Sequence, residues 1–160
     1  MSKIVLPEIN NSSIAIIGLG YVGLPLAVEF AKLRTNQNNS KYRKVIGFDI
    51  NINRIQDLKN GIDKTNEISN KELLKAKGLI LSSESKDIDG SDIFLITVPT
   101  PITSDKNPDL KPLINATETV AKALNRRKNN CNPIIIYEST VYPGTTEEIC
   151  VPIIENISGL

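Results

Sequence analysis

The sequence predicts an α/β fold in which a doubly wound, mostly parallel sheet carries helices on both faces. Short apolar runs rich in β-branched residues alternate along the chain with segments of helical periodicity. A glycine-rich turn, Gly18 to Gly23, joins the first apolar run to the first helical segment, and an acidic residue, Asp49, ends the second run. These three observations are typical of the Rossmann type of dinucleotide-binding domain.

The first two predicted strands are short and apolar. Residues 14–17 (IAII) and 45–48 (VIGF) contain no charged side chain, as strands buried on both faces do. Between them, residues 21–33 place apolar and small side chains at helical spacing, with Pro25 in the first turn, where its missing N–H does least harm. Residues 34–44 are polar and have no period, so we expect a surface loop there.

Two short helices are predicted next from the residues at their ends. Residues 51–60 carry an apolar period, and Gly61 provides a stop signal. Ser69 and Glu72 have the spacing of a capping box, and Gly78 is expected to end the helix that they begin.

The alternation continues through the rest of the chain. We expect strands at residues 79–81, 92–98 and 133–137, and a long helix at residues 112–128 with proline in its first position. The basic triplet 126–128 lies at the end of that helix. A solvated helix terminus explains the triplet better than nucleic-acid binding does.

A last helix is expected to begin near Thr145. Thr145 and Glu148 have capping-box spacing, so the threonine hydroxyl is predicted to cap the first turn. Pro152 should bend this helix, because proline cannot donate a hydrogen bond inside it.

Length and composition favour one domain over residues 1–160, with no nucleic-acid or membrane partner. The formal net charge of +1 attracts neither nucleic acid nor an anionic membrane. No run approaches the ~18 apolar residues of a membrane span, and a signal-peptide pattern is absent, which predicts a cytoplasmic protein. The chain has no His and two cysteines, Cys131 and Cys150, which we interpret as structural thiols, so no metal site is expected.

The glycine turn matches the pattern G-x-G-x-x-G. Gly18 permits the sharp turn out of the strand, Gly20 lets the backbone approach a pyrophosphate, and Gly23 lets the helix pack tightly on the strand. The phosphates would then lie on free N–H groups at the positive end of the helix dipole. Because the motif follows a buried strand and opens a helix, we interpret it as a dinucleotide site.

Asp49 ends the second strand, where an acid binds the adenosine ribose in this fold. Its separation from Gly20 is 49 − 20 = 29 residues. This exceeds the ~20 that is usual, and the polar segment 34–44 accounts for the excess. A carboxylate there repels a 2′-phosphate, which favours NAD over NADP. Arg54 lies one helical turn further on, either over the adenine or exposed to solvent as an ordinary helix residue.

Hydroxyl groups follow the fourth and fifth strands. Thr100 lies between two prolines after the fourth strand, and Ser139 and Thr140 follow the fifth. The carboxyl ends of parallel strands face the ligand crevice, so these residues are expected to border the nicotinamide half. The alternative is that the hydroxyls satisfy loop backbone groups.

Four motifs, in order, give the chain a specific resemblance. GLGYVGLPLA at 18–27, VIGFDIN at 45–51, VPTP at 98–101 and ESTVYPGTTEE at 138–148 resemble the amino-terminal domain of the UDP-glucose/GDP-mannose dehydrogenase family. The stretch that contains LITVPTPI, NPDL and YESTVYPGTTEE is most similar to the branch that oxidises UDP-N-acetylhexosamines to uronic acids, a reaction of polysaccharide biosynthesis. The resemblance covers essentially the whole chain.

The resemblance implies NAD as the cofactor and a nucleotide sugar as the substrate of the full-length protein, which would be a homo-oligomer. It implies a two-step oxidation of a sugar C6 alcohol to a carboxylate with two NAD⁺ and a thiol-linked intermediate. It places Thr140 near the reacting centre, where it helps to position water or a proton. Dinucleotide contacts are implied for Gly18, Gly20, Tyr21, Val22, Gly23, Asp49, Arg54, Thr100 and Thr140.

The family's nucleophilic cysteine, catalytic lysine, acidic loop and substrate domain match nothing in residues 1–160. We therefore expect them beyond Leu160, and we expect this chain to bind the cofactor without turnover. Two alternatives remain from the residues alone: a module that senses dinucleotide without chemistry, and the cofactor domain of a hydroxyacid-type dehydrogenase.

Overall fold

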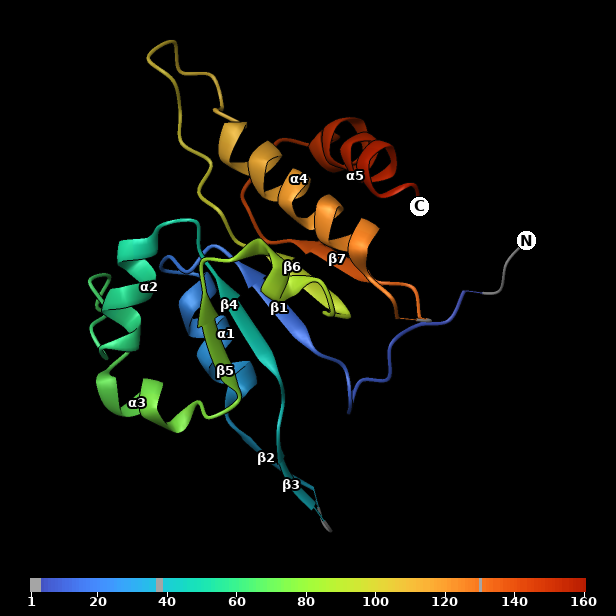
Figure 1. Ribbon diagram of the computed structural model, residues 1–160. Coiled ribbons are helices and arrows are strands. Elements are labelled where there is room, and N and C mark those ends of the chain that lie inside the picture. Colours follow the sequence, from blue (N-terminus) through green and yellow to red (C-terminus); the bar gives the residue numbers. More distant parts are fainter. Residues whose placement is uncertain (1–3, 37–38, 130) are drawn as a thin grey trace.

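The computed structural model describes residues 4–36, 39–129 and 131–160. Five parallel strands form one sheet in the spatial order β5-β4-β1-β6-β7 (Figure 1). Their bounds are Ile14–Ile17 for β1, Val45–Phe48 for β4, Leu79–Ser82 for β5, Ile93–Ile96 for β6 and Ile134–Tyr137 for β7. The chain moves outward from β1 first to one side and then to the other, so a crevice opens between β1 and β6, as in Rossmann folds.

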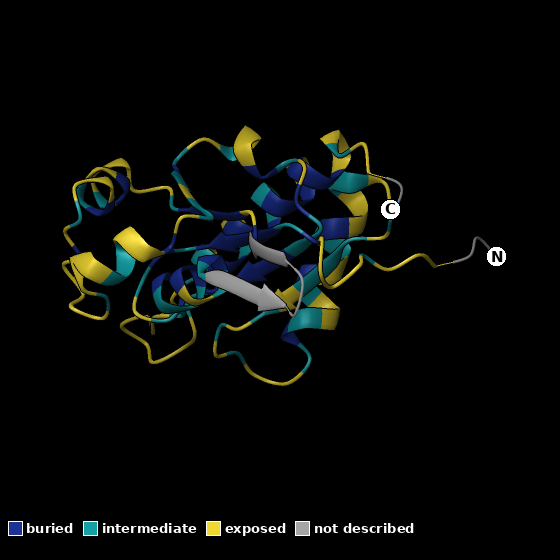
Figure 2. Ribbon diagram, turned by 90° about the horizontal axis from the view of Figure 1, so that it is seen from below, coloured by how far each residue is buried: buried dark blue, intermediate teal, exposed yellow. Residues whose placement is uncertain are grey.

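Helices cover both faces of the sheet, and the central strand divides its side chains between them. Ile14 and Ile16 face the cluster that includes α1 and α2, whereas Ala15 and Ile17 face the cluster that includes α4 and α5. This alternation follows from the two-residue period of a strand. Figure 2 shows the sheet and the inner helix surfaces buried and the outer helix surfaces exposed. The helices are α1 (Gly23–Ala31), α2 (Ile52–Lys59), α3 (Asn70–Lys75), α4 (Lys111–Arg126) and α5 (Val151–Ser158).

The five predicted strands and the doubly wound fold are confirmed. The first two strands have the predicted bounds. The fourth predicted strand, at residues 92–98, corresponds to β6 and is shorter than expected. The Thr97 N–H, just beyond β6, still continues the sheet pairing by donating to the Ile17 carbonyl at 2.9 Å. The capping box of α3 is also present, because Ser69 accepts from the Glu72 N–H while the Glu72 carboxylate accepts from the Ser69 N–H.

The prediction of a loop at residues 34–44 is wrong. The chain forms an antiparallel ribbon there, with β2 (Leu33–Asn36) paired to β3 (Asn39–Tyr42), and residues 37–38 lie outside the described residues. The ribbon projects away from the sheet (Figure 1). Residues 34–44 are almost all polar, so the sequence carries no hydrophobic alternation that could have revealed a ribbon held by backbone hydrogen bonds.

The basic triplet at the end of α4 is solvated at Arg126 and Lys128, as predicted, but not at Arg127. The Arg127 side chain is 5% exposed, and its guanidinium lies 2.9 Å from the Asp92 carboxylate. Arg127 also donates to the Ser91 carbonyl at 2.9 Å, and Arg126 pairs with Asp89 at 2.7 Å. The prediction missed these ion pairs because the acidic partners come from segments 35 or more residues away in sequence.

The expected Thr145 cap is also wrong. The Thr145 hydroxyl donates to the Tyr142 carbonyl at 2.7 Å and makes no cap hydrogen bond. The last helical segment begins with a π-helical turn, η2 (Thr146–Cys150), directly before α5. Pro152 lies in the first turn of α5, and its missing N–H removes the regular bond to Glu148, where the wider turn occurs.

Candidate dinucleotide-binding cleft

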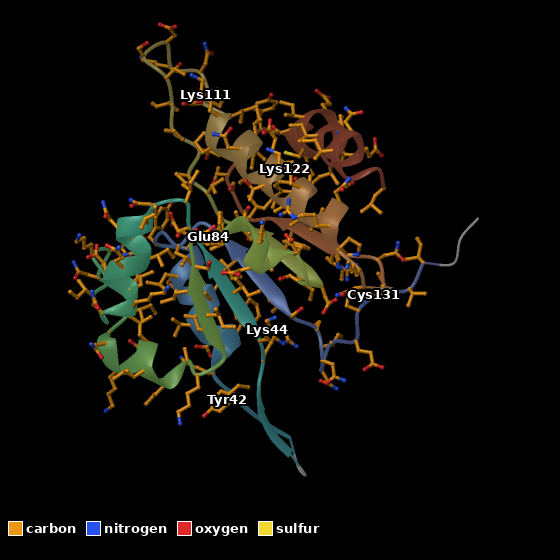
Figure 3. The ribbon with its side chains drawn as sticks, viewed as in Figure 1. Tyr42, Lys44, Glu84, Lys111, Lys122 and Cys131 are labelled. Atoms are coloured by element: carbon orange, nitrogen blue, oxygen red, sulfur yellow. The ribbon has the colours of Figure 1, made fainter. Side chains whose placement is uncertain are left out.

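A cleft of about 570 Å³ opens at the carboxyl ends of β1, β4 and β6. The amino-terminal half of α4 forms its other wall, and Figure 3 labels Lys111 at that end of the helix. Four of the nine predicted contact residues line it, namely Gly18, Gly20, Asp49 and Arg54. The other five, Tyr21, Val22, Gly23, Thr100 and Thr140, are not in its lining.

The three motif glycines have three different structural requirements. Gly18 adopts φ +95°, a left-handed conformation that other residues rarely adopt. A Cβ on Gly23 would lie 1.9 Å from the Gly18 carbonyl oxygen, so only glycine fits where the helix meets the turn. A Cβ on Gly20 would meet nothing within 4 Å. The fold therefore leaves open space at Gly20, on the wall of the cleft.

The start of α1 supplies donors for an anion. The first helical hydrogen bond runs from the Leu24 N–H to the Gly20 carbonyl at 3.1 Å. Within the part of the chain that the structure describes, the backbone N–H groups of residues 20–23 have no partner. Unpaired donors at the positive end of a helix dipole suit the pyrophosphate of a dinucleotide.

Asp49 holds the glycine turn as well as lining the cleft. One carboxylate oxygen accepts from the Leu19 N–H and the other from the Asn51 N–H, both at 2.9 Å. Each carboxylate oxygen has further lone pairs, so Asp49 can still accept from ribose hydroxyls. The acid thus connects the second strand, the glycine turn and the ribose end of the cleft.

Arg54 lines the cleft and is not the freely exposed helix residue that was one of the two alternatives. Its Nε donates to the Leu19 carbonyl at 2.9 Å, and a terminal nitrogen lies 2.7 Å from the Asp63 carboxylate. The Arg54 side chain is 11% exposed and that of Asp63 is 1% exposed. Burial alone would raise the pKa of Asp63, but hydrogen bonds from Thr65, Ile68 and Arg54 hold that pKa well below its usual range.

Thr97 supports the turn from the neighbouring strand. Its hydroxyl lies 2.7 Å from the Gly18 carbonyl, to which it donates, and 3.1 Å from the Ile17 carbonyl. Neither Thr97 nor Asp63 was predicted as a site residue from the sequence. The position of Thr97 at a strand end beside the glycine turn could have indicated its role. Asp63 accepts hydrogen bonds from Thr65, Glu67 and Ile68, as an Asp in a turn often does, but no local pattern indicates its pairing with Arg54.

The hydroxyls after β6 and β7 tie two loops together. Ser139 donates to the Val98 carbonyl and Thr100 donates to the Thr140 carbonyl, each at 2.7 Å. These two hydroxyls therefore satisfy loop backbone groups, the alternative that the sequence left open. The Thr140 hydroxyl makes no hydrogen bond to the described residues, so it can still contact a ligand.

The two cysteines lie away from the cleft. Cys150 is fully buried in the core. Cys131 lies before β7, at the end of the sheet opposite to Lys111 (Figure 3), and its sulfur accepts from Arg127 at 3.1 Å. Among the described residues, no group of three His, Cys, Asp or Glu could hold a metal ion. Over the same residues, no helix is long and apolar enough to span a bilayer.

Comparison with known proteins tests the family resemblance. The sequence profile of the UDP-glucose/GDP-mannose dehydrogenase family, NAD binding domain, matches residues 12–159. The chain belongs to the UDP-glucose/GDP-mannose dehydrogenase family. It is the NAD-binding domain of this family, so the predicted family, fold and cofactor are confirmed.

Relatives within this dehydrogenase family are similar over nearly the whole chain. UDP-N-acetyl-D-glucosamine 6-dehydrogenase of Salmonella typhi is 52% identical over 152 residues, which cover 95% of this chain and 32% of the relative. The enzyme of the same name from Pseudomonas aeruginosa is 50% identical over 151 residues, which cover 94% of this chain and 32% of that enzyme. The chain thus spans about a third of the length of these curated relatives.

Solved structures agree with the family assignment. A UDP-D-ManNAc dehydrogenase from Pyrococcus horikoshii superposes with a TM-score of 0.74 at 36% identity, over 92% of this chain and 33% of that one. A UDP-glucose dehydrogenase from Pyrobaculum islandicum gives 0.77 at 25% identity, over 97% of this chain and 35% of that one. A lactate dehydrogenase from Cryptosporidium parvum gives 0.55 at 20% identity over 96% of this chain and 43% of that one, which shows the shared fold alone.

Proposed function

We propose that this chain holds NAD⁺ for the oxidation of a UDP-N-acetylhexosamine at its C6 alcohol. The observation that carries the proposal is the dinucleotide cleft in a chain about half identical to two UDP-N-acetyl-D-glucosamine 6-dehydrogenases. The overall reaction takes the alcohol, water and two NAD⁺ to a carboxylate, two NADH and three protons. The residues of this chain bind and orient the cofactor, which accepts the hydride when bound.

Each part of the cleft has a defined role in this proposal. The unpaired N–H groups of residues 20–23 bind the pyrophosphate, and the open space at Gly20 admits it. Asp49 accepts hydrogen bonds from the adenosine ribose and disfavours a 2′-phosphate, which supports a preference for NAD over NADP. Arg54 donates a hydrogen bond to the Leu19 carbonyl and so holds the glycine turn in position.

Thr140 is proposed to lie at the nicotinamide end, beside the reacting carbon. Its segment follows β7, and the Thr100 hydroxyl ties its backbone to the loop after β6. The Thr140 hydroxyl, which has no partner among the described residues, would position a water molecule or a proton there. Thr140 cannot replace a thiol nucleophile, because an alcohol without a neighbouring base is a poor nucleophile near neutral pH.

The substrate site and the homo-oligomer implied by the family resemblance belong to the same proposal, as does the cytoplasmic location predicted from the sequence composition. Neither cysteine lines the cleft, so this chain alone is expected to bind NAD without oxidising a sugar.

A chimera tests the proposed function. Residues 12–159 would replace the matching third of the Salmonella typhi relative, and NADH formation would be followed with UDP-N-acetylglucosamine as the substrate. We expect turnover, and we expect Gly20→Val in the same chimera to abolish it. A folded chimera that binds the nucleotide sugar but not NADH would contradict the proposal.

A further inference from the structure

Each nitrogen of the Arg54 guanidinium contacts a protein acceptor, although Arg54 lines the cofactor cleft. Its Nε donates to the Leu19 carbonyl at 2.9 Å, and its two terminal nitrogens reach Asp63 at 2.7 Å and the Thr65 hydroxyl at 3.3 Å. An arginine near the ribose can accommodate the 2′-phosphate of NADP in Rossmann folds. Here all three nitrogens of the arginine are bound to the protein.

Asp63 pairs with this guanidinium and carries the opposite charge. It lies outside the cleft lining, its side chain is 1% exposed, and it is the anionic partner of Arg54. Three backbone N–H groups, from Thr65, Glu67 and Ile68, also donate to its two oxygens at 2.9–3.0 Å. These bonds fix the carboxylate in place, so the position of the guanidinium is fixed as well.

The same contact orients the glycine turn. Arg54 holds the carbonyl of the peptide that joins Leu19 to Gly20. In a trans peptide the N–H points opposite to the carbonyl. The Gly20 N–H, one of the unpaired donors, is therefore directed away from Arg54.

We infer that Asp63 is a specificity-determining residue that acts through Arg54, by holding the guanidinium on the glycine turn and away from a 2′-phosphate. The inference rests on the proposed binding of NAD. Pairing with Asp63 also offsets the positive charge of Arg54, so Arg54 does not compensate the negative charge of Asp49 at this wall of the cleft, whereas Asp109 and Lys111 line it from the side of α4.

The test is the ratio of the NADPH and NADH dissociation constants, measured by calorimetry on the 160-residue chain. Asp63→Asn keeps the shape of the side chain but removes the charge that holds Arg54. We expect NADPH to bind more tightly and the ratio to fall roughly tenfold, the effect of one charge-assisted hydrogen bond. Adding Arg54→Met to Asp63→Asn should restore the original ratio, because the freed guanidinium is then absent.

Asp57→Asn is the matched control. Asp57 lies on α2, pairs with Lys64 at 2.5 Å and does not line the cleft. This variant removes one negative charge from the same region without releasing Arg54, so the ratio should change little. If Asp63→Asn fails to fold, Thr65→Val replaces it, because the Thr65 hydroxyl contacts both Arg54 and Asp63. A smaller fall in the ratio is then expected.

The outcomes separate this inference from the proposed function. A ratio in Asp63→Asn equal to that of the unmutated chain or of Asp57→Asn would overturn the inference, as would a fall that persists after Arg54→Met. If Asp63→Asn does not fold, an unchanged ratio in Thr65→Val overturns it. An unmutated chain that binds neither nucleotide would instead refute the proposed function.

Discussion

The carbonyl oxygen of Gly18 lies 1.9 Å from the point where a Cβ on Gly23 would stand. The turn that leaves β1 and the start of α1 are therefore in direct backbone contact. The Thr97 hydroxyl, which follows β6, lies 2.4 Å from the same point and packs against the same contact. A helix held this closely presents its first N–H groups at a fixed place beside the cleft.

Gly23→Ala should destabilise the fold. The added methyl overlaps a backbone oxygen that cannot move without displacing α1 from the sheet. Overpacking of this kind costs about 1–3 kcal/mol. Urea unfolding followed by far-UV circular dichroism measures it. Gly90→Ala is the control, because a Cβ on Gly90 meets nothing within 4 Å. Equal free energies of unfolding for the two variants would contradict the prediction.

Gly20→Val should leave the fold intact and block dinucleotide binding. A side chain at Gly20 occupies space that the core does not use, and the pyrophosphate needs that space. The circular dichroism spectrum should match that of the unmutated chain, while NADH affinity falls at least about tenfold. Unchanged NADH affinity would show that the glycine motif is only a turn.

Asp49→Ala should weaken NADH binding and reduce the difference in affinity between NADH and NADPH. The substitution removes a ribose acceptor and leaves the Leu19 and Asn51 N–H groups without their partner. Loss of hydrogen bonds to a charged group predicts roughly a tenfold weaker affinity for NADH. Fluorescence titration with both nucleotides measures the change. Equal affinities for NADH and NADPH in the unmutated chain would refute the role given to Asp49.

Asp92 should make stability depend on pH. Burial alone would raise the pKa of Asp92, but hydrogen bonds from Ser13, Asn129 and Arg127 lower it to about 2. The unfolded chain, with a pKa near 3.8, binds the proton more readily. The stabilisation is therefore complete above pH 3.8 and is lost as the pH falls towards 2.

Asp92→Asn, with nearly the same shape, isolates this contribution. It should lower the free energy of unfolding by about 1–3 kcal/mol at neutral pH. The difference from the unmutated chain should shrink as acid protonates Asp92. Urea unfolding over a series of pH values gives the comparison, and a difference that stays constant into acid would refute the assignment.

The 160-residue chain should bind NAD⁺ but form no NADH when mixed with a UDP-N-acetylhexosamine. Cys150 is fully buried, Cys131 lies at the opposite end of the sheet, and the sequence has no His to act as a base. Absorbance of NADH in the near ultraviolet follows the reaction. Turnover that persisted in a Cys131→Ser, Cys150→Ser double variant would contradict the proposal that this chain alone binds NAD without oxidising a sugar.

The sequence predicted those parts of the fold that depend on burial. Strands such as β1 and β4 are buried on both faces, so their apolar runs identify them and their bounds agree with the structure. The residues of the ribbon β2–β3 are mostly polar and were predicted to form a loop. Hydrophobic patterning detects packing, whereas a projecting ribbon is held by backbone hydrogen bonds.

The site was predicted where a local motif defines it and missed where distant segments meet. Gly18, Gly20 and Asp49 follow from strand, turn and spacing, and they line the cleft. Asp63 binds Arg54 across a turn that no pattern specifies. In the same way, Arg127 and Asp92 are 35 residues apart in sequence, and only the packing of α4 against the sheet brings them together.

The ion pair between Asp92 and Arg127 has a consequence for how the sequence can change. Asp92 precedes β6 and Thr97 follows it, so about 16 Å of strand separates this pair from the glycine turn. Substitutions so far apart, with no shared partner, change the free energy of unfolding additively. Variation that alters cofactor choice at one end of the strand is therefore tolerated as long as the other end keeps the chain folded, and the two ends can evolve independently.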